Sequence, residues 1–503
     1  MTPSVVPTLF DPVPSLNAQP QVRAVEAFDV GELDAVAVFV TSDGDVPTDL
    51  GLSREVLVAS GFSAKAGTSL LVPRPEGPLL VAVGVGATAD LDAAGLRDAA
   101  AAAGRATAKV AARLGLRVPT TGTAAPEDAG RALAEGIVLA RYRYTAFIAK
   151  PGDTPLTHAE LLVDGAEVGD VAQGVAAGLV STRTATVARD LANTPAGYLS
   201  ASTMADVAVR LGGTFGFEVT VHDKAALLEL GCGGLLGVNA GSTEPPRMIV
   251  LHYRPQTAAT GHLGLVGKGI MYDSGGISLK PSDPMHLLMK MDMGGAAAVL
   301  GAFTGLRDAG ASAEVTAWLM CTDNMPSGSA TKLGDILVAR NGTTVEVKNT
   351  DAEGRLVMMD GLALAVEAGV DAIVDIATLT GAALMALGGY RAPVYGTAPA
   401  LIEQVVAAST LVDDPVWAMP LEKKYRSQLD SEIADIANLG GSHAGATTAA
   451  LFLSEFVGET PWAHLDIAGT MQVDKDDSWR SKGATGFGAR ILMEVARGFT
   501  TPA

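Results

Sequence analysis

Segments typical of strands alternate with segments typical of helices along most of this chain, and this alternation limits its fold more than any other feature. The clearest part has strand patterns at 217–221, 248–253 and 263–266 and helical patterns at 202–211 and 224–230. That order predicts an α/β domain with a mostly parallel central sheet covered by helices on both faces. Catalytic groups in such domains lie in loops beyond the carboxyl ends of the strands.

The first third of the chain repeats the alternation on a smaller scale. Strand patterns at 35–40, 69–72 and 79–85, with Ala-rich helical patterns at 90–114 and 126–143, predict a smaller N-terminal α/β domain over 22–169. It contains no ligand-like cluster of acids, histidines or cysteines, so assembly or lid formation is its expected role.

A long helical pattern connects the two expected domains. It covers 170–193 and ends at Thr194-Pro195, because proline restricts the residue before it and stops a helix. We therefore expect a disordered lead-in over 1–21, a linker helix over 170–193 and a catalytic domain over 194–503.

Length, charge and cysteine content restrict the kind of protein further. A chain of 503 residues is long enough for two to four domains at roughly 150 residues each. The net charge of −19 opposes binding to nucleic-acid phosphates, and no apolar stretch reaches the roughly 18 uninterrupted residues of a membrane span. The start lacks a basic or apolar targeting pattern, and only Cys232 and Cys321 are present. These features predict a soluble, cytoplasmic protein without membrane or nucleic-acid partners.

Two carboxylates and a guanidinium lie together in Asn349-Thr350-Asp351-Ala352-Glu353-Gly354-Arg355-Leu356, at the start of a strongly helical stretch. In an extended segment Asp351 and Glu353 leave the same face and suit convergence on metal ions. A helix cap with a first-turn acid explains the same spacing. Arg355 beside a helix start favours an anion pocket as well, which a cap does not need.

A second polar run precedes it, after the strand pattern at 263–266. Lys268, Asp273 and Lys280 lie among glycines, and Asp292 follows before Met293-Gly294-Gly295. Each has a simpler interpretation: a surface lysine, an Asp-Ser-Gly turn, or a cap of the next helix. Asp283 is a competing acid. Together with the octapeptide, however, the run indicates a hydrolytic centre with two metal ions.

Other catalytic patterns are absent from the sequence. It has no HExxH, no GxSxG and no phosphate-binding GxxxxGK[ST], which argues against a zincin, a serine hydrolase and a phosphate loop. His286 and His464, the histidines nearest these motifs, are expected to be structural. A carboxylate-rich site suits Mg or Mn, and also paired Zn. A metal-dependent phosphoesterase and a nucleic-acid-binding regulator remain as rival functions.

These motifs carry a resemblance to the leucyl (cytosol) aminopeptidase family of dinuclear metallo-exopeptidases. NTDAEGRL at 349–356 and VGKGIMYDSGGISLKP at 266–281 are its most specific parts, and the likeness runs from about Ala188 to about Ala496. It includes NMPSGSA at 324–330, ATLTGA at 377–382, DIANLGG at 435–441 and WAHLDIAGT at 462–470.

The resemblance implies a role for individual residues. One metal would be held by Lys268, Asp273, Asp292 and Glu353, and the other by Asp273, Asp351 and Glu353. Lys280 would face the scissile carbonyl, and Arg355 would hold a bicarbonate as proton acceptor. The residues implied to contact the substrate are Met289, Thr378, Leu379, Gly381, Ala468 and Met471.

The resemblance also implies an activity and an assembly. The expected reaction is hydrolysis of the first peptide bond of peptides with a free amino terminus, using two Zn or Mn ions and a bridging hydroxide, with broad specificity and a preference for Leu- or Met-like residues. A homohexamer is the expected assembly. The sequence departs from the usual pattern by one extra residue between Lys280 and Asp292, and by Tyr272, His286 and Asp323. These departures concern the pocket rim rather than the ligands.

Overall fold

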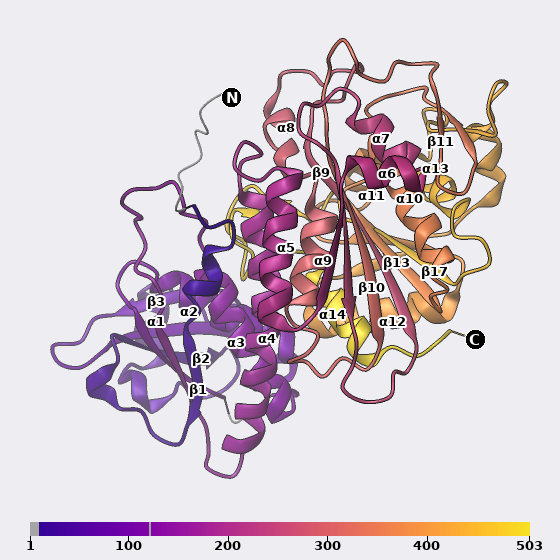
Figure 1. The fold of residues 1–503 in the computed structure, drawn as a ribbon. Helices are drawn as coiled ribbons and strands as arrows, with labels where there is room; N and C mark the ends of the chain where they lie inside the picture. The colour runs from indigo at the N-terminus through magenta and orange to yellow at the C-terminus, as the bar shows by residue number, and fades with distance from the viewer. Residues whose placement is uncertain (1–9, 120–121, 503) are drawn as a thin grey trace. The chain divides into compact units, whose positions relative to one another are not determined.

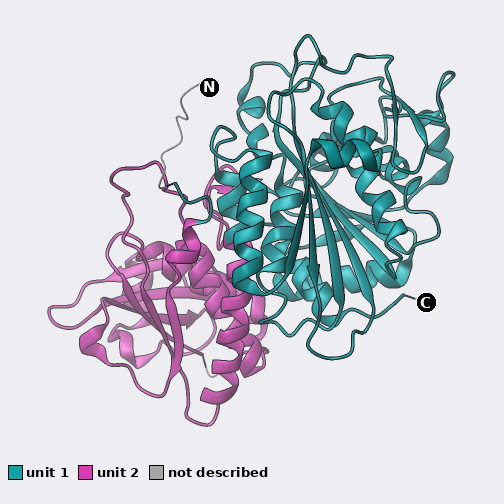
Figure 2. Ribbon diagram, viewed as in Figure 1, with its two compact units in different colours: residues 1–13, 187–472, 484–503 teal, residues 14–186, 473–483 magenta. Residues whose placement is uncertain are grey.

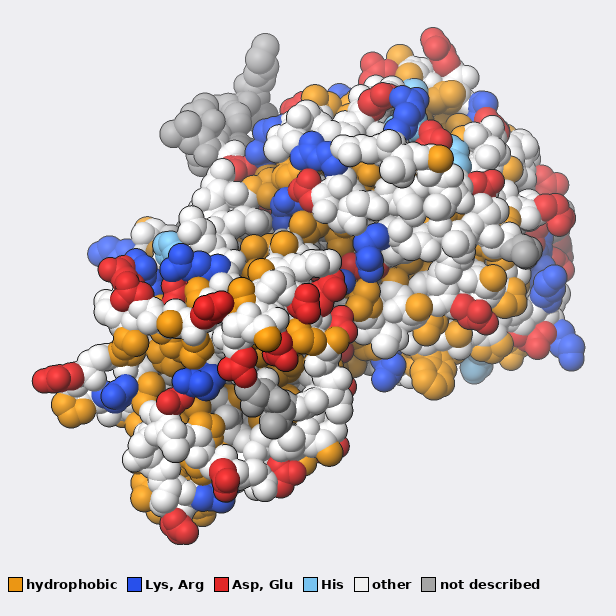
Figure 3. All heavy atoms as spheres, turned by 90° about the horizontal axis from the view of Figure 1, so that it is seen from below, with side chains coloured by type: hydrophobic (Ala, Val, Ile, Leu, Met, Phe, Trp, Pro, Cys, Tyr) orange, Lys and Arg blue, Asp and Glu red, His pale blue; other side chains and the backbone are white. Residues whose placement is uncertain are grey.

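The computed structural model describes residues 10–119 and 122–502 and divides the chain into two compact units (Figures 1 and 2). Unit 2 contains Pro14–Thr186 and Val473–Gly483, and unit 1 contains Met1–Val13, Val187–Gln472 and Ala484–Ala503. No helix in the described part of the chain combines the length and apolar character needed to cross a bilayer. On the face drawn in Figure 3, acidic side chains are spread among apolar and basic ones, so the net negative charge does not gather in one patch there.

Unit 2 is built on a six-stranded sheet in the order β1-β6-β5-β2-β4-β3, in which only β3 runs antiparallel to its neighbour. Its buried cluster joins the central strands to two long helices. The bounds are β1 Gln21–Val25, β2 Ala35–Thr41, α1 Arg54–Ala59, β3 Ser69–Val72, β4 Leu79–Gly86, α2 Ala93–Ala106, β5 Arg113–Arg117, α3 Pro126–Arg141 and β6 His158–Leu162.

Two expectations for this region differ from the structure. The helix expected over 90–114 ends at Ala106, and Arg113–Arg117 forms β5, because Leu114 and Leu116 are buried in the sheet rather than on a helix face. The expected lead-in lies partly outside the described residues, at 1–9. Its later part is ordered, since Pro14–Asn17 forms a 3-10 turn, Val13 is buried and Gln21 starts β1.

A segment far away in the sequence completes unit 2. Val473–Gly483 leaves β18 (Gln472–Val473) and returns through β19 (Gly483–Ala484). Its Trp479 is buried in a small cluster with Ala101, Leu139, Ala140 and Ala185. Arg143 binds Asp476 at 2.7 Å, so packing and an ion pair both hold this segment.

The long helix α4 (Val168–Asn193) ends directly before Thr194-Pro195, where the sequence places its end. It is followed in unit 1 by an eight-stranded sheet in the order β15-β14-β17-β13-β9-β10-β8-β7. The four strands β17, β13, β9 and β10 run parallel to one another. The strand bounds are β7 Glu218–His222, β8 Arg247–Tyr253, β9 His262–Asp273, β10 Glu314–Asn324, β13 Ala372–Ala377, β14 Ala392–Gly396, β15 Val416–Ala418 and β17 Trp462–Asp466.

Helices cover both faces of this sheet, as predicted (Figure 1). Two neighbouring residues of β9 show this directly: Val266 touches Gly361 of α10, whereas Gly267 touches Ala296 of α9. The helices of unit 1 are α5 Ala201–Phe215, α6 Lys224–Leu230, α7 Gly233–Asn239, α8 Pro284–Leu287, α9 Gly294–Phe303, α10 Glu353–Glu367, α11 Gly381–Leu387, α12 Pro399–Val412, α13 Gly445–Ser454 and α14 Ala489–Gly498. A small sheet joins β11 (Ile336–Val338), β12 (Thr344–Glu346) and β16 (Ile436–Ala437).

Strand β9 is longer than its sequence pattern indicates. It was expected to end at Val266 but continues to Asp273, so Lys268 and Asp273 lie on the strand and not in a loop. Pairing with β10 sustains it, with a shift of register just before Asp273 meets Asn324. The carboxyl ends of β9, β10, β13 and β17 therefore lie side by side, which is where the polar residues gather.

Candidate metal centre

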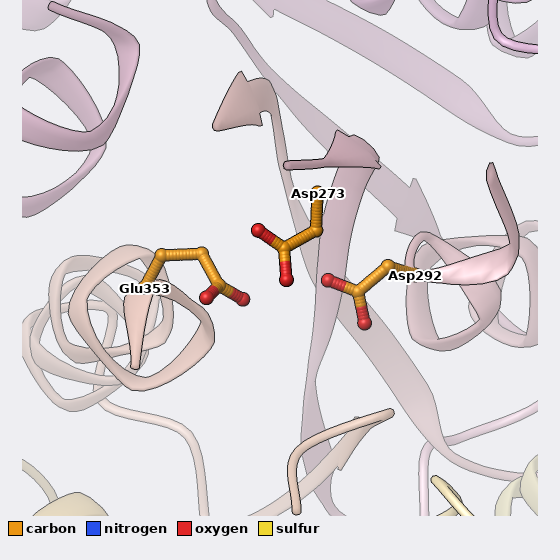
Figure 4. Close-up of side chains that lie close together, drawn as sticks. All are labelled: Asp273, Asp292 and Glu353. Atoms are coloured by element: carbon orange, nitrogen blue, oxygen red, sulfur yellow. The ribbon is translucent and has the colours of Figure 1, made fainter. Parts of the chain in front are cut away.

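Three buried carboxylates from separate parts of the chain converge at this edge of the sheet. Asp273 ends β9, Asp292 follows the 3-10 turn Met289–Met291, and Glu353 is the first residue of α10. One oxygen of each lies within 4.8 Å of the others, and the three side chains point toward one another (Figure 4). Like charges so close in a dry site require cations nearby.

Two lysines approach these carboxylates from either side. The Lys268 ammonium is 2.8 Å from Asp292 Oδ1, 2.9 Å from Glu353 Oε1 and 2.9 Å from the Thr378 carbonyl oxygen to which it donates. Lys280 Nζ is 2.8 Å from Asp273 Oδ2 and 2.5 Å from Asp351 Oδ1. Asp351 thus joins the group through Lys280.

The charge balance of the cluster shifts its acid–base equilibria. Burial raises the pKa of Asp292, Glu353 and Asp351, neighbouring carboxylates add to the effect, and the lysines oppose it. Burial alone would lower the pKa of Lys268, but Asp292, Glu353 and Asp273 outweigh it and raise that pKa. A divalent charge among these acids would favour the neutral amine, the form that coordinates a metal.

The donor set fits divalent cations. Glu353 Oε2 is buried and has no hydrogen-bond partner among the described residues. Carboxylate oxygens are suitable ligands for Mg, Mn and Zn. Lys268, Asp273, Asp292, Asp351 and Glu353, which the resemblance names as ligands, are the residues that could hold such ions.

Some of the simpler interpretations hold: Asp273 Oδ1 accepts a hydrogen bond from the Gly275 N–H at 2.9 Å, as in an Asp-Ser-Gly turn, and Glu353 is a first-turn acid of α10. The helix-cap interpretations of Asp351 and Asp292 and the surface interpretation of Lys268 are wrong. The N-cap of α10 is Ala352 and that of α9 is Met293, so neither Asp351 nor Asp292 is the N-cap of the helix that follows it. Lys268 is 2% exposed, which rules out a surface lysine. The competing acid Asp283 instead caps α8 by accepting a hydrogen bond from the His286 backbone N–H at 3.0 Å.

Two asparagines that the sequence analysis did not single out hold the acidic segments in place. Asn324, at the end of β10, donates to Asp273 Oδ1 at 2.8 Å and to the Thr350 carbonyl at 2.9 Å. Asn438 donates to the Asn349 carbonyl at 2.7 Å and accepts from the Lys348 N–H at 2.8 Å. Asn324 ends a strand next to β9, a position that could have identified it.

Asp466 is a third missed residue and organises the loop after β13. It accepts hydrogen bonds from the N–H groups of Leu379 and Ala468 and from the Thr380 hydroxyl, the last at 2.6 Å. Thr378 Oγ1 donates to Asp292 Oδ1 at 2.7 Å, which ties this loop to the carboxylates. Asp466 ends β17, so the same strand-end argument applies to it.

Arg355 lies two residues after Glu353 on α10 and is buried. Its Nη1 donates to the Asn438 carbonyl at 2.9 Å, while Nε has no hydrogen-bond partner among the described residues. Burial lowers the pKa of Arg355 to about 10, and Glu353 and Asp466 oppose that effect. A buried guanidinium with an unused donor suits an anion.

The residues expected to contact substrate lie around the same edge. Met471 and Thr378 meet at Gly294, where an added Cβ would be 2.7 Å from Met471 Cε and 3.4 Å from Thr378 Cγ2. Leu379 and Ala468 are half-buried and fixed by Asp466, and Gly381 is exposed at the start of α11. Met289 is half-buried in the 3-10 turn before Asp292.

The two histidines near the motifs take the structural positions expected of them. His464 is fully buried, with Nδ1 2.5 Å from Asp375 Oδ1. The His286 ring packs beside Tyr272 with 5.9 Å between ring centroids.

Comparison with known proteins agrees with this geometry. Residues 186–493 match the catalytic-domain model of the cytosol aminopeptidase family, and 40–151 match its N-terminal-domain model. Probable cytosol aminopeptidases of Solibacter usitatus and Roseiflexus castenholzii are 39% and 40% identical, over 94% and 89% of this chain and 98% and 93% of theirs. The solved structure of the bottromycin maturation enzyme BotP in complex with Mn superimposes with a TM-score of 0.84, at 38% identity, over 92% of this chain and 99% of that one.

Proposed function

This chain belongs to the cytosol aminopeptidase family, so we propose that it removes the first residue of peptides with a free amino terminus, and that it prefers Leu- and Met-like residues. Family membership makes it a metal-dependent exopeptidase. The observation that carries the proposal is the buried group Asp273, Asp292 and Glu353 with Lys268 and Lys280 beside it.

Two divalent ions per subunit, Zn or Mn, are part of this proposal. Lys268, Asp273, Asp292 and Glu353 would hold one, and Asp273, Asp351 and Glu353 the other. The close carboxylates and the buried, unpartnered Glu353 Oε2 support this ligand set. Such ions, when bound, supply an activated water and polarise the carbonyl that it attacks.

Lys280 is the proposed stabiliser of the oxyanion that forms on the scissile carbonyl. Its Nζ lies between Asp273 and Asp351, so it is held at the edge of the carboxylate cluster with its charge intact. These carboxylates raise its pKa above the ordinary value against the effect of burial. The α-amino group of the substrate would bind beside Asp292, which restricts cleavage to the first residue.

Arg355 is the proposed site of a bicarbonate that accepts a proton during the reaction. Its buried guanidinium and its unused Nε support binding of a small planar anion next to Glu353. Added bicarbonate is expected to raise turnover of the wild type and to leave an Arg355→Met variant unchanged.

The pocket for the first side chain is proposed to consist of Met289, Thr378, Gly381, Ala468 and Met471, with Leu379 contacting the substrate through its backbone. Apolar walls favour Leu and Met. A missing methylene costs only about 1 to 3 kcal/mol in such a pocket, so specificity is broad. The names of the relatives support a cytoplasmic location, and a homohexamer is the proposed assembly.

The proposal is tested by the release of leucine from Leu-Gly and from N-acetyl-Leu-Gly, with chelator-treated protein before and after addition of Mn or Zn. We expect metal-restored cleavage of Leu-Gly alone. Equal cleavage of the acetylated peptide would refute an aminopeptidase, and cleavage without metal would refute the role of the centre.

A further inference from the structure

The last turn of α4 is linked by hydrogen bonds to two separate segments of unit 1. Arg189 and Asn193 are 0% and 6% exposed, although they lie at the end of a helix. Their partners are the 3-10 turn that carries Met289 and the strand pair that follows Met471. Both methionines belong to the pocket of the proposed function.

The first link leads to the Met289 side. Lys290 Nζ donates to the Asn193 carbonyl oxygen at 2.7 Å. This carbonyl belongs to the last residue of α4, where helix carbonyls have no partner within the helix and carry a partial negative charge. An ammonium is a strong donor for such a group, so the link fixes the backbone of the 3-10 turn.

The second link leads to the Met471 side. Asn193 Oδ1 accepts a hydrogen bond from the Ala484 N–H at 3.0 Å, and Arg189 Nε donates to the Thr485 carbonyl at 2.7 Å. Thr485 in turn donates from its N–H to the Met471 carbonyl at 2.9 Å and from its hydroxyl to the Thr470 carbonyl at 2.7 Å. The residues of this link are all buried, and the chain of bonds ends at Met471 in the pocket wall.

We propose that Lys290, Asn193 and Arg189 are positioning residues that set the distance between Met289 and Met471 and so determine selectivity for the first side chain of the substrate. Methionine side chains are flexible and adapt to their surroundings, so the shape of a pocket between two of them depends on where their backbones are held. Asn193 is the shared point, because its carbonyl serves one wall and its amide oxygen serves the other. The inference rests on the proposed function through its assignment of the pocket.

The test compares Lys290→Met, which keeps the length of the side chain but not the donor, with Lys290→Arg, which keeps a charged donor. Asn193→Ala removes the bond to the Ala484 N–H from the second link, and Lys224→Met, at an exposed position on α6, is the matched control. Initial rates are measured for Leu-Gly and Ala-Gly, and amide hydrogen exchange is followed over 289–292 and 470–485.

We expect the ratio of kcat/KM for Leu-Gly over Ala-Gly to fall about tenfold in Lys290→Met and Asn193→Ala, mainly through KM, because that is the scale on which a pocket distinguishes side chains. Lys290→Arg and Lys224→Met should keep the ratio. Exchange should become faster at 289–292 in Lys290→Met and at 484–485 in Asn193→Ala.

An unchanged ratio in both variants would overturn the inference, and so would an equal loss of activity on both peptides together with loss of bound metal, which would place the effect at Asp292. Should the wild type cleave neither peptide, the proposed function fails. In that case only the hydrogen-exchange data test the positioning role, and unchanged exchange in both segments refutes it.

Discussion

Both units bury acidic side chains, but they balance the charge differently. In unit 2, Glu135 is fully buried and accepts from Arg97 at 2.7 Å, Arg131 at 3.0 Å and Ser181 at 2.7 Å. In unit 1, the four carboxylates of the centre face two ammonium groups, and Glu353 keeps a buried oxygen without a hydrogen-bond partner in the described residues. Burial of charge therefore does not identify a site, whereas several carboxylates gathered around fewer ammonium groups do.

The largest difference between Glu353 of unit 1 and Glu135 of unit 2 should appear in activity. Replacing Glu353 by Gln removes a proposed metal ligand, so turnover of Leu-Gly should fall to background and bound metal should decrease. Stability of the chelator-treated variant should not decrease, because burial already raises the pKa of Glu353 and disfavours its charge. Atomic absorption, peptide kinetics and thermal unfolding measure the three effects, and a fully active variant would contradict the assignment.

For Glu135→Ala we expect a loss of stability without a loss of activity. This change leaves Arg97 and Arg131 buried without their shared partner, which typically costs about 3 to 5 kcal/mol of unfolding free energy. The folded fraction should keep its kcat and its metal content. Urea unfolding with parallel assays checks this, and loss of kcat at full stability would show that the cluster in unit 2 has a catalytic role.

Lys280→Met sharpens the comparison within the centre. It removes a proposed transition-state contact without removing a proposed ligand, so kcat should fall by about 100- to 1000-fold. Metal content should stay close to that of the wild type, in contrast to the Glu353 variant. A parallel loss of metal would instead assign Lys280 to holding the carboxylates in place.

Asp360 shows a third kind of balance, and its effect is expected in the pH dependence of stability. It is fully buried and accepts from the N–H groups of Leu235 and Arg340 at 3.0 Å and 2.9 Å, and burial raises its pKa to about 7. The folded protein then holds a proton that the unfolded chain releases near pH 4. Stability should therefore fall by about 1.4 kcal/mol per pH unit as pH rises from about 4 to about 7.

Stability curves of the wild type and of Asp360→Asn at several pH values check this effect. The variant should lack this part of the pH dependence, whatever its absolute stability. Parallel curves for the two proteins would show that Asp360 does not titrate in this range.

The sequence predicted the acidic residues of the centre better than the elements that carry them. Asp273 and Glu353 were identified by residue type and by motif, which do not depend on the fold. Lys268 was expected in a loop because the apolar pattern stops at Val266, but pairing with β10 extends β9 to Asp273. Long-range strand pairing is not visible in a local pattern.

The supporting residues were missed for a related reason. Asn324, Asn438 and Asp466 act through hydrogen bonds to backbone groups and to Asp273. They lie in motifs of the family resemblance, but a motif does not show which of its residues holds the acidic segments in place. Their position at or near strand ends becomes informative only when the strand order is known. The helix expected over 90–114 failed similarly, since Ala-rich composition does not show that Leu114 belongs to a sheet.

The segment Val473–Gly483 has a consequence for the order in which this protein can be made. The cluster of unit 2 that contains Ala101, Leu139 and Ala185 also requires Trp479. During synthesis that tryptophan leaves the ribosome only after the whole of 187–472, and domains usually fold as units in the order of their synthesis. Unit 2 is thus the first unit to begin folding and among the last to be completed. A chain terminated before Trp479 would leave apolar surface exposed in unit 2, around Ala101 and Leu139.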